Sequence, residues 1–143
     1  MGKVKEKQFA ELKQIPDSIS DSEVLYWLKS KEINWSYMKM FKDYSSRRDE
    51  VISNMLNISV RTLRNYKKPE NKFKNNIKEQ LLLLLSLYKH GNEVFGSSEE
   101  FNNWLNSENF YFDGVAPVTF LNTITGIRFT EDRLTAMEYG DNV

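Results

Sequence analysis

Apolar residues recur three and four positions apart along most of this chain, and strict alternation of apolar and polar residues is rare. This spacing places apolar side chains on one face of a helix, whereas a half-buried strand would need a period of two. Val24, Leu25 and Leu28 mark one such face after the capping residues Ser20–Ser22. The pattern predicts an all-α fold.

The longest predicted helix runs from about Phe73 to Lys89 and contains the run Leu81–Leu85, which is apolar on every side. A helix of this kind is expected at the centre of a core, and Gly91 is expected to end its pattern. Further boundaries are predicted from capping residues, proline and glycine. Ser97 is expected to begin a helix and Pro117 another that Gly126 ends, and Thr130 is expected to cap a last helix ending at Gly140.

These elements predict a helical bundle with a helix-turn-helix, followed by a small helical domain. The expected domain organisation is a flexible N-terminus over residues 1–20, a helix-turn-helix domain over 21–72 and a second domain over 73–143. The residue before Pro69 avoids helical backbone angles, which favours a break between the two domains.

The helix-turn-helix is predicted over residues 47–68. Ile52 and Leu56 supply the apolar side of its first helix, and Asn57 stands at the turn, where a positive φ is needed. Leu63 and Tyr66 are expected to bury the inner face of the second helix. An αα-hairpin without a nucleic-acid role is the alternative interpretation.

The outer face of the second helix carries side chains suited to reading DNA. Arginine pairs with guanine and asparagine with adenine in the major groove, and lysines contact phosphates. Because one such unit reads only a few base pairs, a homodimer on a two-fold operator is expected. The predicted DNA-binding residues are Ser59, Val60, Arg61, Arg64, Asn65 and Lys68.

The chain has equal numbers of acidic and basic residues, but their distribution is uneven. Residues 1–90 hold 18 Lys and Arg against 11 Asp and Glu, whereas residues 91–143 hold 2 against 9. The front therefore carries +7 and the back −7, which suggests two different partners or head-to-tail self-association. No cysteine, membrane-length apolar run or signal peptide is seen, so a cytoplasmic protein is expected.

No group of residues indicates catalysis. His90 is the only histidine, and a capping or surface role is the simplest interpretation of it. The pairs Glu99–Glu100 and Glu131–Asp132 are interpreted as first-turn carboxylates that favour the helix dipole. No enzyme activity, cofactor, metal or small-molecule substrate is therefore predicted.

An ordered set of short motifs nevertheless distinguishes the second half of the chain. It comprises Phe95-Gly96, Trp104-Leu105, Gly114 to Pro117, Phe120-Leu121, Thr123 to Gly126 and Tyr139-Gly140. This set resembles the toxin-binding domain of the Xre/ParS-like antitoxins, which carry a helix-turn-helix ahead of it. The match of Ser59 to Leu63 to the "S-x-R-T-L" recognition helix of those antitoxins adds to the resemblance.

The resemblance implies an antitoxin that covers the active site of a RES-domain toxin consuming NAD⁺, and that represses its own operon. The acidic back half is complementary to a cleft built for an anionic dinucleotide. A stand-alone transcriptional regulator, whose acidic domain oligomerises or senses a ligand, is the alternative. The residues expected to contact the toxin are Glu131, Arg133, Glu138, Tyr139, Asp141, Asn142 and Val143.

Overall fold

A computed structural model describes residue 8 and residues 10–140, and every regular element among them is helical, as the sequence predicts. None of these helices combines the length and apolarity needed to cross a bilayer. The α-helices are α2 (Asp21–Ser30), α3 (Trp35–Ser45), α4 (Asp49–Leu56), α5 (Val60–Asn65), α6 (Asn75–Phe95), α7 (Ser98–Asn106) and α8 (Ile124–Glu138). Two 3₁₀ helices, η1 (Phe110–Phe112) and η2 (Pro117–Phe120), lie between α7 and α8.

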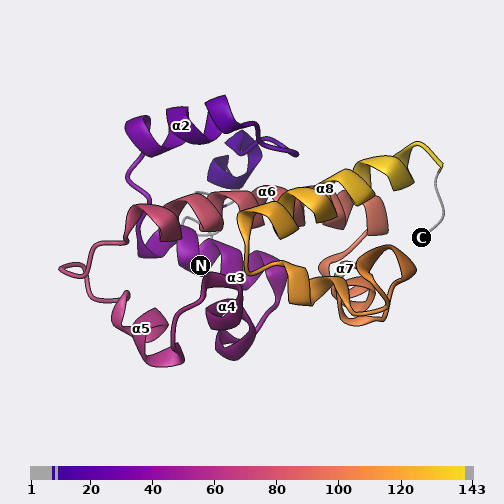
Figure 1. The fold of residues 1–143 in the computed structure, drawn as a ribbon. Coiled ribbons are helices and arrows are strands. Elements are labelled where there is room, and N and C mark those ends of the chain that lie inside the picture. Colours follow the sequence, from indigo (N-terminus) through magenta and orange to yellow (C-terminus); the bar gives the residue numbers. More distant parts are fainter. Residues whose placement is uncertain (1–7, 9, 141–143) are drawn as a thin grey trace.

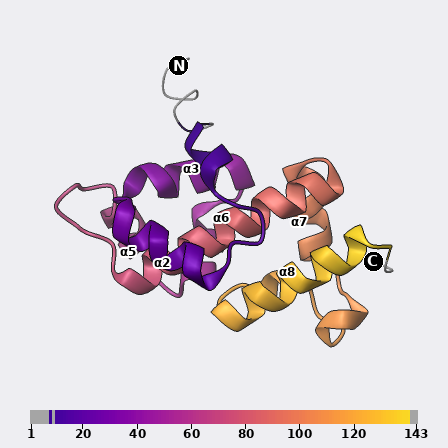
Figure 2. The ribbon, with the colours of Figure 1, turned by 90° about the horizontal axis from the view of Figure 1, so that it is seen from above.

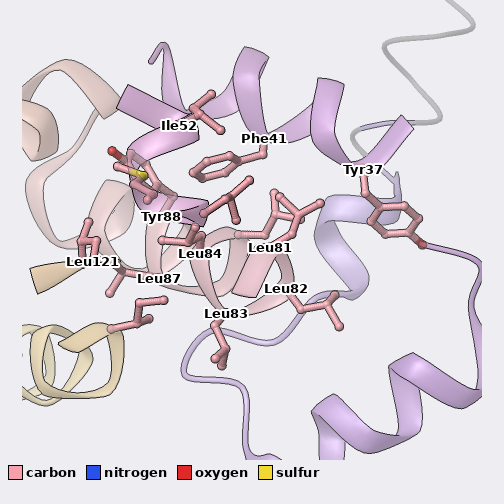
Figure 3. Packing of buried hydrophobic residues seen from close by; sticks show 14 of the residues in the cluster. Tyr37, Phe41, Ile52, Leu81, Leu82, Leu83, Leu84, Leu87, Tyr88 and Leu121 are labelled. Atoms are coloured by element: carbon pink, nitrogen blue, oxygen red, sulfur yellow. The ribbon is translucent and has the colours of Figure 1, made fainter. Parts of the chain in front are cut away.

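Helix α6 runs through the middle of the molecule and contacts α2, α3, α4, α7 and α8 (Figure 1). All five residues of Leu81–Leu85 are buried, which confirms the central position expected of this run. The labelled side chains leave α6 in different directions: Leu81 and Leu84 lie toward Phe41, whereas Leu82 and Leu83 point away from it (Figure 3). One helix therefore supplies the core of both predicted domains, and the buried residues form a single cluster.

The prediction that Gly91 interrupts the long helix is wrong, because α6 continues through it to Phe95. Gly91 is needed for packing rather than for a turn. A β-carbon at this position would lie 2.2 to 2.5 Å from three ring carbons of Phe101 in α7. The glycine that does end α6 is Gly96, whose φ of 90° is in the left-handed region.

The predicted boundaries at Gly126 and Thr130 are also wrong, since both residues lie inside α8. The helix begins after Thr123, whose hydroxyl accepts a hydrogen bond from the backbone N–H of Gly126 at 2.9 Å. Thr130 is buried, and its hydroxyl donates to the Gly126 carbonyl one turn earlier at 2.8 Å. Pro117 begins only the short η2, and α8 runs unbroken to Glu138.

Residues 10–20 pack on α6, although a flexible segment was expected there. Ile15 and Ile19 are almost fully buried. The Ser86 hydroxyl of α6 ties this segment down, because it donates to the Pro16 carbonyl at 2.6 Å and accepts from the Ile19 N–H at 2.9 Å. The N-terminal segment is thus part of the core that supports α6.

Candidate functional site

Helices α4 and α5 are joined by the three-residue turn Asn57-Ile58-Ser59. Asn57 takes the left-handed conformation at φ 56° and ψ 40°, as its position in the sequence predicts. Ser59 caps α5 by accepting a hydrogen bond from the N–H of Thr62 at 3.0 Å. Leu63 is fully buried, so the opposite side of α5 is left facing outward.

The predicted DNA-binding residues lie on that outward side or at its ends. Arg61, Arg64, Asn65 and Lys68 are exposed, and Ser59 is exposed at the cap. Val60 is half-buried. The outward side of α5 therefore exposes the guanidinium groups of Arg61 and Arg64 and the amide of Asn65.

Arg64 has a partner within the fold. Its Nε atom lies 3.1 Å from Asp49 at the start of α4, and the Lys42 ammonium lies 2.7 Å from the same carboxylate. Hydrogen bonding from Lys42, aided by Arg64, holds the pKa of Asp49 below its usual value. The ion pair with Asp49 therefore holds the Arg64 guanidinium beside α4, while 57% of the Arg64 side chain remains exposed.

Lysines continue the positive surface beyond α5. The Lys67 ammonium lies 5.7 Å from the centre of the Trp35 ring, and Lys72 lies 3.6 Å from Glu32. Lys67, Lys68, Lys72 and Lys74 are all exposed. This side of the molecule suits the sugar-phosphate backbone of a nucleic acid.

The second half of the chain forms a module of α7, η1, η2 and α8 at the other end of α6, away from α5 (Figure 2). Its core is aromatic. The Phe112 ring lies 5.7 Å from Trp104, 5.2 Å from Phe120 and 5.1 Å from Phe129, measured between ring centres. These contacts hold the loop between α7 and α8 against α8.

Apolar side chains of this module also reach the surface. The exposed fraction is 88% for Phe110 and 87% for Tyr139. Of the three consecutive aromatic residues Phe110, Tyr111 and Phe112, only Phe112 is buried. Large exposed apolar groups in one region are typical of a binding surface.

His90 joins three parts of the fold, whereas the sequence suggests only a capping or surface role for it. It is 3% exposed, not at the surface. Its Nδ1 atom bonds the Glu131 carboxylate and its Nε2 atom bonds the Glu138 carboxylate, while the Ser18 hydroxyl donates to Glu131. Hydrogen bonding to Glu131 is the main cause that raises the pKa of His90 to about 9, so the ring is charged at neutral pH.

The residues expected to contact a toxin fall into different environments. Glu131 is buried against His90, and the structure therefore assigns it an internal role instead of a surface one. Arg133 is half-buried, with its guanidinium 3.7 Å from the centre of the Tyr111 ring. Glu138 and Tyr139 are exposed, whereas Asp141, Asn142 and Val143 lie outside the described residues.

The signals that would have identified the His90 site are not local. Glu131 and Glu138 follow His90 by 41 and 48 residues, and they share one face of α8 because they are seven residues apart. The predicted last helix from Thr130 to Gly140 already contains both glutamates. Its misplaced start, however, gives Glu131 the role of a first-turn carboxylate rather than that of a partner for His90.

The comparison with known families concerns the same module. No curated protein matches the chain closely enough to count as a relative. Residues 90–140 match the family model described as the antitoxin Xre/MbcA/ParS C-terminal toxin-binding domain. This match spans the end of α6 from His90, together with α7, η1, η2 and α8. Residues 90–140 are thus similar to a toxin-binding domain of the antitoxin type, which supports an antitoxin role.

Proposed function

We propose that this protein is the antitoxin of a type II toxin–antitoxin pair, which blocks a RES-domain toxin that consumes NAD⁺ and represses its own operon. The observation that carries the proposal is the toxin-binding domain at residues 90–140. The two-sided charge supports it, because the residues after Gly91 carry −7 while those up to His90 carry +7. A cytoplasmic toxin that binds an anionic dinucleotide needs a positive cleft, and the acidic module is complementary to it.

The test of this proposal uses the product of the reading frame adjacent to this gene. The two proteins are co-expressed with a tag on the neighbour, and the complex is purified. The purified neighbour is then assayed for NAD⁺ consumption with and without this chain. We expect a stable complex and loss of NAD⁺ consumption on mixing. A neighbour that neither binds the chain nor acts on NAD⁺ would contradict the proposal.

Within this proposal, the end of α8 and the residues after it enter the toxin's active site. Tyr139 and Glu138 lie at the exposed end of the helix, and Asp141, Asn142 and Val143 follow them. A chain ended after Glu138 keeps the bond between Glu138 and His90. A cut before Arg133 would instead remove Leu134, which is fully buried, and would damage the core.

We therefore expect the chain ended after Glu138 to keep its melting temperature within a few degrees but to inhibit the toxin at least tenfold more weakly. The inhibition constant against the purified toxin measures the loss of inhibition, and a thermal melt measures the stability of the shortened chain. Tyr26→Ala is the matched control, since Tyr26 is another exposed tyrosine, on the remote helix α2. Full inhibition by the shortened chain would show that the end of the chain is not the blocking element.

Repression is proposed to depend on the outer face of α5. We expect Arg61→Ala combined with Arg64→Ala to weaken binding to the promoter DNA about 100-fold, since each good arginine–base pair accounts for roughly 1–3 kcal/mol. The fold should remain intact because Lys42 still pairs with Asp49. Fluorescence anisotropy with promoter DNA measures the loss, and Lys39→Ala, at an exposed ion pair on α3, is the control. Equal affinity of the double variant and the wild type would exclude α5 as the reading helix.

A further inference from the structure

The loop between α7 and α8 places aromatic rings on the surface of the toxin-binding module. We name Phe110, Tyr111, Phe120 and Phe129 the aromatic surface. Tyr111, Phe120 and Phe129 line one open groove together, and the Phe110 ring lies 5.5 Å from Tyr111. Phe120 and Phe129 stack at 6.2 Å. The four rings therefore form one continuous region contributed by η1, η2 and α8.

The backbone of this loop is fixed by its own hydrogen bonds. The Asn109 side chain accepts from the Tyr111 N–H at 2.9 Å, and the Asn109 carbonyl accepts from the Gly114 N–H at 2.9 Å. Asp113 and Gly114 both adopt positive φ, which closes the turn. Phe112 is buried between Trp104 and the rings of the groove. Burial of Phe112 turns its neighbours Phe110 and Tyr111 outward.

An outward phenylalanine held in a rigid loop is costly in water but favourable for binding. Exposed apolar area is unfavourable by roughly 25 cal/mol per Å² until a partner covers it. A loop that is already ordered loses little entropy when it binds. Among residues 10–140, packing does not require an apolar side chain at Phe110, which is 88% exposed.

The charge around the aromatic surface is negative. Asp113 lines the groove, Glu108 precedes Phe110 by two residues, and Asp132 lies one turn after Phe129 on α8. All three acids are exposed. Arg133 stacks on Tyr111, and Arg128 pairs with Asp21 at 2.6 Å. A partner that fits this surface offers apolar side chains surrounded by lysine or arginine.

We propose that the aromatic surface is a docking site for the toxin, separate from the end of the chain, and that it receives an apolar patch with a basic rim. The inference rests on the proposed antitoxin function. All four rings lie inside the segment 90–140 that matches a toxin-binding domain. Docking at the aromatic surface holds the module against the toxin and thereby positions the end of α8 at the toxin's active site.

A second copy of this chain is the competing occupant. A symmetric contact through this surface brings Glu108, Asp113 and Asp132 of one copy against the same residues of the other, which is repulsive. The basic front half of another copy is the remaining possibility, and it would produce head-to-tail association. Sedimentation of the chain alone measures its self-association, and it therefore distinguishes a second copy of the chain from the toxin as the occupant.

The test measures the affinity of the full-length chain for the purified product of the adjacent reading frame. The variants are Phe110→Ser and the pair Glu108→Gln with Asp113→Asn, and Leu25→Ser is the control at an exposed leucine of α2. Asparagine suits position 113 because it tolerates the positive φ. Circular dichroism melts establish that each variant is folded.

We expect Phe110→Ser to raise the dissociation constant about 30-fold or more, as for a residue at the centre of an interface. The double amide variant is expected to slow association and to reduce its dependence on salt. Leu25→Ser should change affinity less than threefold. If wild type and Phe110→Ser bind equally, the aromatic surface is not the docking site although the antitoxin function stands. If the wild type does not bind the neighbour, both proposals fail. Self-association that Phe110→Ser abolishes would assign the surface to a second copy and overturn the inference.

Discussion

Gly126→Ala is expected to destabilise the module of α7, η1, η2 and α8 by about 3 kcal/mol, at the upper end of the cost of overpacking a core. A β-carbon at this position would lie 1.8 Å from the Phe120 carbonyl oxygen and 2.8 Å from its carbonyl carbon. These are backbone atoms of η2, so no side-chain rotation relieves the contact. Either η2 moves away from α8 or the first turn of α8 unwinds.

Two measurements check this expectation. Thermal or urea unfolding should show the loss of stability, and binding to the proposed toxin partner should weaken because η2 and α8 both contribute to the aromatic surface. Thr125→Ala is the matched control, since Thr125 is the preceding residue of the same helix and is exposed. An unchanged melting temperature for Gly126→Ala would mean that η2 does not pack against α8 in the way the structure describes.

His90→Ala is expected to lower the free energy of unfolding by a similar amount, roughly 3–5 kcal/mol, because it removes the charged partner of a buried carboxylate. The substitution leaves the Glu131 carboxylate buried without its cation, and it removes one of the links between α8 and α6. Tyr26→Ala, at an exposed residue of α2, is a suitable control for truncation of a large side chain. A loss below about 1 kcal/mol in urea unfolding would contradict the assigned role of His90.

The same site predicts a dependence of stability on pH. The pKa of His90 is about 9 in the folded protein, above its ordinary value of 6.5 in an unfolded chain. The stabilisation by protonated His90 is therefore fully present below pH 6.5 and is lost as the pH rises through 9. The shift corresponds to roughly 3 kcal/mol. Unfolding measured from pH 6 to 10 should show this loss in the wild type and a much smaller one in His90→Ala. Parallel pH profiles of the wild type and His90→Ala would show that protonated His90 does not stabilise the fold.

Features set by neighbouring residues were predictable from the sequence. The caps at Ser20, Ser59 and Ser97 follow from a hydroxyl placed before a helical pattern, and each accepts the expected backbone hydrogen bond. The turn at Asn57 follows from the tolerance of asparagine for positive φ. The burial of Leu81–Leu85 follows from an apolar run that has no polar side.

Features set by residues distant in the sequence were not predictable. Gly91 and Gly126 look like helix ends, because a glycine that terminates a helix and one that admits a close neighbour are the same residue type. Phe101 and the carbonyl of Phe120 decide which role each has. Phe110 looks like a core residue until the loop places Phe112 inside and turns Phe110 outward. The partners of His90 are likewise separated from it by more than 40 residues.

Growth of a bacterial culture that expresses the adjacent reading frame is the measurement that tests the antitoxin function most directly. We expect the neighbour alone to arrest growth, and co-expression of this chain to restore it. The DNA-surface variant Arg61→Ala with Arg64→Ala should also restore growth when both genes are driven from foreign promoters, whereas Gly126→Ala should not. A neighbour that arrests growth equally with and without the wild-type chain would contradict the antitoxin function.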